Sequence, residues 1–274
     1  MNDLRNIKIS SGKPCLFLFL IDQSGSMEET WTSELGSKAD CLANYINQII
    51  REIGLKCVSN QEVKNRFEIG ILGYGKDGCV YSAFEGSLSY DKSKTWLFGI
   101  EELFKNPYGY APDSGNPIWI TTSAYHQTPM TEAFNTAKSI IADWVDWGNH
   151  YDSHPPIVIN ITDGMPTDAG EGFEMLIEAA DEIKKLHTVH GNTMIFNCHI
   201  DNGNMDSILF PDNLDNIFDP YARVMFDISS GLMPKMLEEA NRKGYDLSHL
   251  SKGFAYNAGP KDLIKFLQIG SSAA

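Results

Sequence analysis

The chain has 274 residues, of which 42% are hydrophobic and 21% charged, so it is long enough for one large α/β domain or two small ones. Its net charge of −14 argues against a nucleic-acid partner, because phosphate binding requires a basic surface. The charge favours cations or a basic protein surface as partners, and an acidic cytosolic protein of bacterial type explains it equally well.

The apolar and cysteine patterns predict a cytoplasmic protein without membrane contact. No stretch approaches the ~20 apolar residues of a membrane span, and the run at 15–21 lacks the basic region and cleavage site of a signal peptide. The five cysteines show no CxxC or Cys/His zinc spacing, so we expect buried free thiols in a reducing compartment.

Hydrophobic periodicity predicts alternating strands and helices along the chain. We expect strands at 15–21, 67–74, 79–84, 157–161, 193–198 and 254–256, and helices at 37–53, 93–105, 129–147, 171–187, 233–243 and 260–269. This alternation predicts an α/β fold with a doubly wound, mostly parallel sheet and helices on both faces. Asp77-Gly78 indicates a hairpin, which makes 79–84 an antiparallel edge strand.

We expect a single domain over 1–270. An irregular insertion at about 85–127 either helps to select a partner or caps the core, because long loops in compact domains are often functional. The Asp- and Asn-rich stretch 201–222 is also expected to be irregular, and 271–274 to form a disordered tail.

Oxygen-bearing side chains follow two of the predicted parallel strands. Asp22, Ser24 and Ser26 come directly after the run 15–21, and Asp163 comes after 157–161. Parallel strands end at the same edge of a sheet, where open α/β folds bind their ligands. Carboxylates and hydroxyls are the ligands that small hard cations such as Mg²⁺ prefer. The sequence therefore predicts a metal site, although Asp and Ser also favour the cap of a helix.

The motif Asp22-x-Ser24-x-Ser26 resembles the metal-ion-dependent adhesion site of von Willebrand factor A (VWA) domains. That family completes the site with a threonine before a later helix and an aspartate after a later strand, and Thr128 and Asp163 match those positions in order and context. The family often has two glycines before the threonine, where this chain has His and Gln.

The resemblance implies a VWA fold over nearly the whole chain and a bound Mg²⁺, with Mn²⁺ or Ca²⁺ as alternatives. The hydroxyls of Ser24, Ser26 and Thr128 would hold the cation, while Asp22 and Asp163 would act directly or through water. In the family, a Glu or Asp of a protein partner fills the open coordination position.

The chain also resembles bacterial intracellular VWA proteins, including the tellurite-resistance type, which have a stretch like Thr128-Pro129-Met130. This resemblance implies a non-enzymatic interaction module in signalling, stress response or assembly. The implied partners are a Ser/Thr kinase, a PP2C-like phosphatase or a MoxR-type ATPase.

Two other functions remain open. One is a Mg²⁺-dependent phosphoester hydrolase that uses the same acidic edge, although such an enzyme needs an added nucleophile or base at the metal. The chain contains neither a GxSxG elbow nor a GxxxxGK[ST] phosphate loop. The other is a VWA-fold scaffold whose metal site is structural or empty.

Several further polar residues are expected to have structural roles. We predict helix N-caps at Thr167 or Asp168, solvated surface positions for Glu28, Glu29 and Glu132, and a surface loop carrying His150 and His154.

Overall fold

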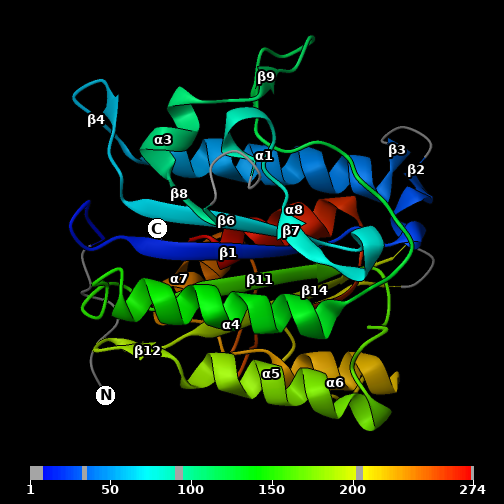
Figure 1. Ribbon diagram of the computed structural model, residues 1–274. Helices are drawn as coiled ribbons and strands as arrows, with labels where there is room; N and C mark the ends of the chain where they lie inside the picture. Colours follow the sequence, from blue (N-terminus) through cyan, green and yellow to red (C-terminus); the bar gives the residue numbers. More distant parts are fainter. Residues whose placement is uncertain (1–8, 33–35, 90–94, 202–205, 273–274) are drawn as a thin grey trace.

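A single sheet organises the computed structural model, which describes residues 9–32, 36–89, 95–201 and 206–272 (Figure 1). Its strands run in the order β15-β16-β14-β11-β1-β6-β7, and β8 also pairs with β6. The strands of the sheet are β1 (Cys15–Asp22), β6 (Phe67–Tyr74), β7 (Val80–Ser82), β8 (Leu97–Gly99), β11 (Ile157–Thr162), β14 (Met194–Ile200), β15 (Ile208–Leu209) and β16 (Phe254–Ala258).

The five central strands β6, β1, β11, β14 and β16 are parallel, as predicted. The hairpin strand β7 returns antiparallel to β6, which confirms the antiparallel edge strand. Two more antiparallel strands were not predicted: β8 pairs with β6, and β15 pairs with β16 at the opposite edge. The sheet is therefore parallel in its centre and antiparallel at both margins.

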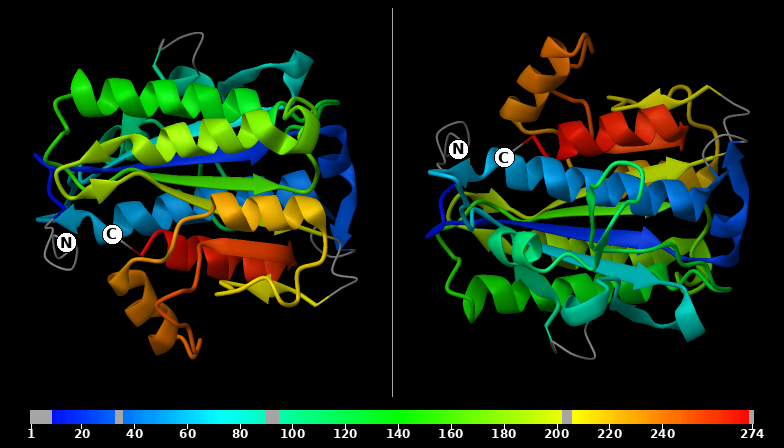
Figure 2. Two further views of the ribbon diagram at one scale, coloured as in Figure 1. Left: turned by 90° about the horizontal axis from the view of Figure 1, so that it is seen from below. Right: turned by 90° about the horizontal axis from the view of Figure 1, so that it is seen from above.

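Helices cover both faces of the sheet, and α4 and α5 lie on the side opposite to α1 and α8 (Figure 2). The helices are α1 (Lys38–Lys56), α3 (Ile100–Lys105), α4 (Met130–Asp146), α5 (Glu174–Lys185), α6 (Pro220–Ile228), α7 (Pro234–Arg242) and α8 (Pro260–Gly270). Side chains of α3 and α7 join the core under α1 and α8, and those of α6 join the core under α4 and α5.

Short elements decorate this core. They are the strand pairs β2 (Thr30–Thr32) with β3 (Gly36–Ser37), β4 (Val58–Ser59) with β5 (Glu62–Val63), β9 (Gly109–Tyr110) with β10 (Pro117–Ile118) and β12 (His187–Thr188) with β13 (Gly191–Asn192), and the 3-10 turns η2 (Gly25–Glu28), η3 (Lys76–Gly78), η4 (Gly86–Leu88) and η5 (Glu171–Phe173).

The unbroken apolar run of β1 is explained by its central place in the sheet. Phe17 and Phe19 face the core under α1 and α8, whereas Leu18 and Leu20 face the core under α4. Because side chains alternate along a strand, a strand buried on both faces needs apolar residues at every position. The run ends at Asp22, which the parallel register places at the carboxyl edge beside the end of β11.

Two predictions about local structure were wrong. The segment 93–105 is not one helix, because 97–99 adds to the sheet as β8 and only 100–105 is helical. The segment 85–127 also contains the short elements η4, β9 and β10, while 90–94 lies outside the described residues. The stretch around 220 begins a helix, α6, which was not predicted.

The end of the chain is packed as far as it is described. Ser271 and Ser272 are buried, and the Ser272 hydroxyl donates to the Ile269 carbonyl over 2.7 Å. The predicted disorder therefore does not begin at 271, while 273–274 lie outside the described residues. Across the described ranges, no helix has the length and apolar character needed to cross a membrane.

Candidate metal centre

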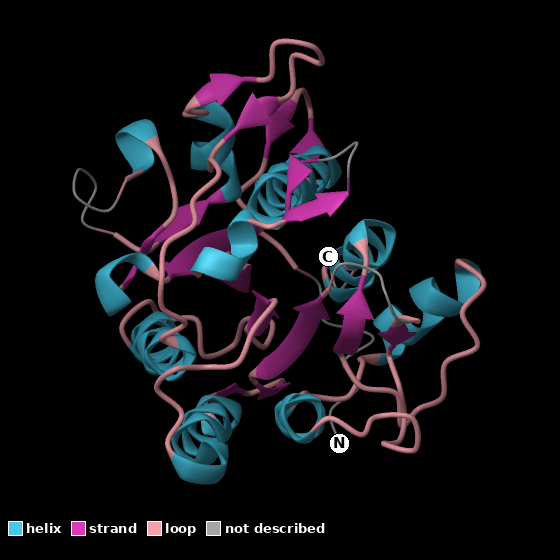
Figure 3. Ribbon diagram, turned by 90° about the vertical axis from the view of Figure 1, so that its right-hand side faces the viewer, coloured by secondary structure: helices cyan, strands magenta, loops and turns pink. Residues whose placement is uncertain are grey.

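Four of the five predicted ligands gather where β1 and β11 end, at the edge that faces the viewer in Figure 3. The hydroxyls of Ser24 and Ser26 lie 3.1 Å apart. The Ser26 hydroxyl donates to Asp163 Oδ1 over 2.7 Å, which links the loop after β1 directly to the loop after β11. The carboxyl ends of adjacent parallel strands therefore bring these side chains together, as the sequence predicted.

Asp22 is a buried carboxylate in the floor of this cluster, with 1% of its surface exposed. Its Oδ1 accepts from the Ser24 backbone N–H over 2.8 Å, and its Oδ2 accepts from the Thr162 hydroxyl over 2.6 Å. Both donors are neutral. Burial, reinforced by the nearby charge of Asp163, raises the pKa of Asp22 to about 7. A cation placed here would compensate a charge that the protein otherwise buries at a cost.

The loop that precedes α4 lies across the loop that carries the two serines. The Tyr125 N–H donates to the Gln23 carbonyl over 2.6 Å, and the Tyr81 hydroxyl donates to Gln23 Oε1. A Cβ atom at Gly25 would lie 2.8 Å from the Tyr125 carbonyl oxygen. Glycine at position 25 therefore allows an approach that other residues would block.

The fifth predicted ligand, Thr128, is held beside the loop after β11 by its backbone. The Thr128 carbonyl accepts from the Thr167 N–H over 2.9 Å, and the Thr128 N–H donates to the Thr167 hydroxyl over 3.3 Å. Thr128 itself is buried. These bonds bring the three site loops into one structure, although they do not include the Thr128 hydroxyl.

The prediction that Thr167 or Asp168 is a helix N-cap was wrong, because Pro129 stands at the N-cap of α4 and Phe173 at that of α5. The Asp168 side chain instead caps, from a distant loop, the first turn of a helix that precedes it in the chain. Its two carboxylate oxygens accept from the backbone N–H groups of Thr131 and Glu132, in the first turn of α4, over 3.0 and 2.9 Å. An acidic group at a helix N-terminus satisfies unpaired N–H groups and complements the helix dipole. The cap thereby anchors the loop after β11 to the start of α4.

The structure adds one residue that the sequence analysis missed. The Lys38 ammonium lies 2.9 Å from Asp163 Oδ2 and 2.9 Å from Glu29 Oε2. Burial alone would lower the pKa of Lys38, but the carboxylates of Glu29 and Asp163 outweigh this effect and hold the pKa above its ordinary value. The only available signal was a lysine in the first turn of a helix, where the helix dipole disfavours a cation.

Two other predictions about polar residues were wrong. His154 is buried, with its ring Nδ1 donating to the Pro155 carbonyl over 2.8 Å, so it is not part of a surface loop. Cys79 is exposed rather than buried in a strand, whereas the other four cysteines are buried thiols. Neither residue contributes to the candidate site.

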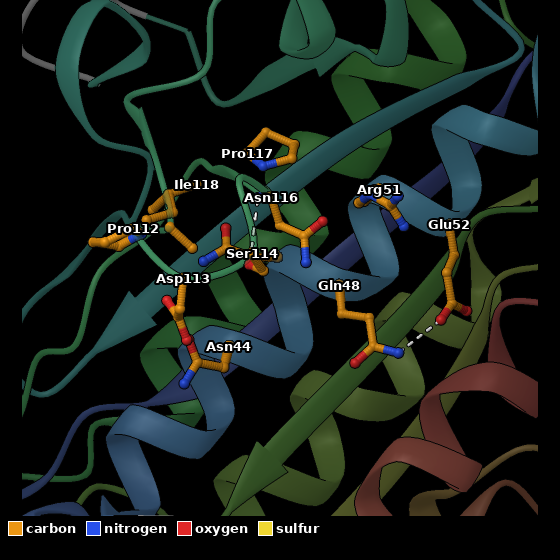
Figure 4. A pocket seen from close by; sticks show the side chains of 12 residues that line it. Asn44, Gln48, Arg51, Glu52, Pro112, Asp113, Ser114, Asn116, Pro117 and Ile118 are labelled. Atoms are coloured by element: carbon orange, nitrogen blue, oxygen red, sulfur yellow. Dashed lines mark hydrogen bonds between the residues drawn. The ribbon is translucent and has the colours of Figure 1, made fainter.

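An open groove of about 700 Å³ lies away from these loops (Figure 4). It runs between α1 and the segment that carries β10, and polar side chains of α1 such as Asn44 and Gln48 line it. None of the five predicted ligands lines this groove. A second open groove, of about 790 Å³, borders the site loops and is lined by Gln127, Pro129 and Thr167.

The donor set of the edge fits a hard divalent cation. It consists of the carboxylates of Asp22 and Asp163 and the hydroxyls of Ser24 and Ser26, with Thr128 nearby, and Mg²⁺ and Mn²⁺ favour such oxygen ligands. Within the described ranges, no group of three or more His, Cys, Asp or Glu side chains is arranged to hold a metal.

Fold and site together define an α/β protein with a doubly wound, mostly parallel sheet, consistent with VWA and Rossmann-like folds, and with an oxygen-lined carboxyl edge. Comparison with known protein families gives no match, and no curated protein matches the sequence. Among solved structures, the chain is similar to the pilus adhesin SpaC from Lactobacillus rhamnosus GG, with a TM-score of 0.51 and 12% identity over 95% of this chain and 31% of that chain.

Two further solved structures match more loosely. The manganese-loaded TRAP protein of Plasmodium vivax has a TM-score of 0.37 and 18% identity over 69% of this chain and 58% of that chain. The type V pili tip protein Mfa5 of Porphyromonas gingivalis has a TM-score of 0.30 and 17% identity over 56% of this chain and 20% of that chain. The chain thus spans less than two thirds of each of these proteins, and the likeness to SpaC shows the fold alone.

Proposed function

We propose that this chain is a VWA-type interaction module that binds Mg²⁺ at the carboxyl edge of its sheet and uses it to dock an acidic residue of a protein partner. The observation that carries the proposal is the direct hydrogen-bonded connection from Ser24 through Ser26 to Asp163, beside the buried carboxylate of Asp22. Mn²⁺ and Ca²⁺ are alternative cations, because both accept oxygen ligands.

The chain's own residues have distinct tasks in this proposal. Asp22, Asp163, Ser24, Ser26 and Thr128 would hold the cation. Once bound, the cation supplies an electrophilic centre that a partner carboxylate can join. The hydrogen bonds among the three loops hold the edge in place before any partner arrives, which lowers the entropy cost of docking.

The edge also offers apolar contact area beside the polar centre. Met165 lies two residues after Asp163 and is 63% exposed. Exposed methionine is common at adaptable protein-binding surfaces. A partner that presents an acidic residue to the cation would therefore bury the Met165 side chain at the rim.

The cellular role follows from the sequence resemblance. We propose a cytoplasmic, non-enzymatic protein whose partner is a Ser/Thr kinase, a PP2C-like phosphatase or a MoxR-type ATPase in a bacterial signalling, stress-response or assembly complex. Neither nucleic acid nor a membrane is part of this proposal, and the net charge of −14 supports the first exclusion.

Metal binding is tested first, with the purified chain and Mn²⁺ or Mg²⁺ in a calorimetric titration. Asp22→Asn keeps the shape of the side chain and removes its charge, and we expect it to weaken metal binding by at least about a hundredfold, as loss of a charged ligand does. Asp143→Asn, on the exposed face of α4, is the matched control and should bind like wild type. Equal binding by all three proteins would contradict the proposal.

Partner docking is tested next, by pull-down from the native lysate with Mg²⁺ or with EDTA. A protein recovered only with Mg²⁺, and lost in Asp22→Asn, supports metal-bridged docking. The same partners in every lane would favour the scaffold with a structural or empty site. Phosphoester turnover that disappears in Asp22→Asn would favour the hydrolase.

A further inference from the structure

A buried lysine already occupies part of the space around the candidate ligands. The Lys38 side chain is 5% exposed and the Asp163 side chain is 0% exposed, and their charged atoms lie 2.9 Å apart. Glu29, the second partner of Lys38, is 57% exposed. The ammonium is therefore held between one carboxylate inside the site and one at the surface.

Nothing in the start of α1 requires a lysine at this position. Ser37 caps the helix, and Asp40 returns a bond to the Ser37 backbone, so the capping box is complete without Lys38. A cation in the first turn is opposed by the helix dipole, and burying an ammonium is costly unless it is paired. The cost of this placement is offset by the two carboxylates, and the inner one is a candidate metal ligand.

The pairing changes what Asp163 offers to a cation. Oδ2 accepts from Lys38 and Oδ1 accepts from the Ser26 hydroxyl, so both oxygens already have a donor. The ammonium also neutralises one of the two carboxylate charges of the site. The oxygens of Asp22 accept only from neutral donors, so Asp22 has no such compensating cation.

We propose that Lys38 is a built-in opposing cation, which weakens metal binding by the chain alone so that tight binding requires an additional carboxylate from a partner. The proposal rests on the proposed function of the same edge. A divalent cation entering the site meets the positive charge of Lys38, whereas a partner carboxylate restores the negative charge that Lys38 has neutralised. Lys38 is a positioning residue here, because it acts through Asp163.

Glu29 is a second ion-pair partner that can keep the Lys38 ammonium when a cation binds Asp163. When a cation takes Asp163, Lys38 retains its bond to Glu29 and moves toward the surface. Loss of Glu29 would leave Asp163 as the partner of Lys38 and would make the site harder to load. Lys38 and Glu29 are therefore expected to affect metal affinity in opposite directions.

The test is a Mn²⁺ titration of the full chain, followed by the electron paramagnetic resonance signal of free Mn²⁺. Lys38→Met should bind Mn²⁺ at least about tenfold more tightly than wild type, because one full positive charge beside the site is removed. Lys38→Arg keeps the charge and should stay within about threefold of wild type. Unchanged or weaker binding by Lys38→Met would overturn the inference.

Glu29→Gln provides a second test in a variant that alters only an exposed side chain. It should weaken Mn²⁺ binding about threefold or more, and this effect should vanish in the Lys38→Met background, because the two residues act as one unit. Equal effects of Glu29→Gln in both backgrounds would contradict the coupling. A purely structural role of Lys38 would change the thermal stability in EDTA without this pattern of affinities.

Failure of the inference and failure of the proposed function give different results. If wild type binds Mn²⁺ through Asp22 and Lys38→Met binds no better, the function stands and the inference is wrong. If wild type does not bind and Lys38→Met does, Lys38 opposes the cation as inferred, while the chain does not use a metal on its own.

Discussion

The two ends of the neighbouring strands β1 and β11 each bury a titratable side chain, and the two burials have opposite electrostatic consequences. At the amino end, His154 donates to a backbone carbonyl and lies 3.4 Å from the Cys15 sulfur, and burial lowers its pKa to about 4. At the carboxyl end, Asp22 lies near a second carboxylate, and burial raises its pKa to about 7.

The comparison teaches that burial favours the neutral form in both places but leaves only one of them in need of a partner. A neutral imidazole with a backbone acceptor is satisfied within the protein. Two neighbouring carboxylates favour a cation, and Lys38 supplies one for Asp163 but leaves Asp22 with neutral donors. The amino end therefore contributes to stability, while the carboxyl end is suited to binding.

Protonation of the buried His154 at the amino end should destabilise the fold at low pH, and this is the largest effect that we expect. His154 has a folded pKa of about 4 against an ordinary 6.5, so the unfolded chain binds a proton that the folded chain refuses between these pH values. The contribution of His154 to the free energy of unfolding should therefore fall by about 3 kcal/mol as the pH drops from 6.5 to below 4, whereas the raised pKa of Asp22 acts in the opposite direction over this range. The difference between wild type and His154→Gln in urea unfolding at several pH values isolates the His154 contribution.

The control for this prediction is a pair of histidine variants. His154→Gln removes the titrating group and should lose about 3 kcal/mol less stability than wild type between pH 6.5 and 4. His150→Gln, at a partly exposed ring that stacks on Trp144, should leave the dependence in place. Identical pH profiles for wild type and His154→Gln would show that the buried imidazole is not the cause.

Adding a side chain at Gly25, where two loops approach closely at the carboxyl end, should have the next largest effect. Gly25→Ala places a Cβ 2.8 Å from the Tyr125 carbonyl, so a loop must move, and we expect a loss of about 2 kcal/mol in unfolding free energy. Metal affinity should fall as well, because the moved loop leads to Thr128. Gly12→Ala has no neighbour within 4 Å and should be nearly neutral. Unchanged stability and affinity in Gly25→Ala would show that the loops are not tightly coupled.

Removing the cap that joins two site loops should cost somewhat less. Asp168→Ala leaves two N–H groups of α4 without their acceptor, and we expect a loss of about 1 kcal/mol in urea unfolding. Asp143→Ala, an exposed position near the other end of α4, should change stability by less than about 0.5 kcal/mol. If the Asp168 cap supports only the helix, Asp168→Ala should leave Mn²⁺ affinity unchanged. If the cap also positions the site, Asp168→Ala should lower that affinity.

Thiol labelling should distinguish the buried amino end from the exposed turn after β6, and we expect no change in the stability of the fold. Cys79 lies in the turn after β6 and is exposed, whereas Cys15 at the amino end of β1 is fully buried, and burial raises its pKa strongly. The native chain should therefore react rapidly with one equivalent of Ellman's reagent, and all five thiols should react after unfolding. Cys79→Ser should abolish the rapid phase. A rapid phase that survives this substitution would mean that a buried thiol is accessible.

Long periodic elements of the fold were predictable, whereas short ones at the margins were not. The strand 67–74 was predicted with the bounds that β6 has, because apolar residues recur through it from Phe67 to Tyr74. The residues of β8 have apolar spacing that suits a helix equally well, and the open edge of β6 decides their conformation. Asp219 caps α6 and Pro220 begins it, a local signal that the surrounding irregular sequence obscured.

The sequence by itself determined the buried strand that ends at Asp22 and the oxygen donors that follow it, because strand periodicity and ligand chemistry are local properties. It also placed Asp163 at the same edge, since parallel strands end together. Only the tertiary structure decided that Lys38 meets Asp163, 125 residues away along the chain, and that Asp168 caps a preceding helix. Such contacts depend on how distant loops pack over the edge, and no spacing in the sequence encodes that packing.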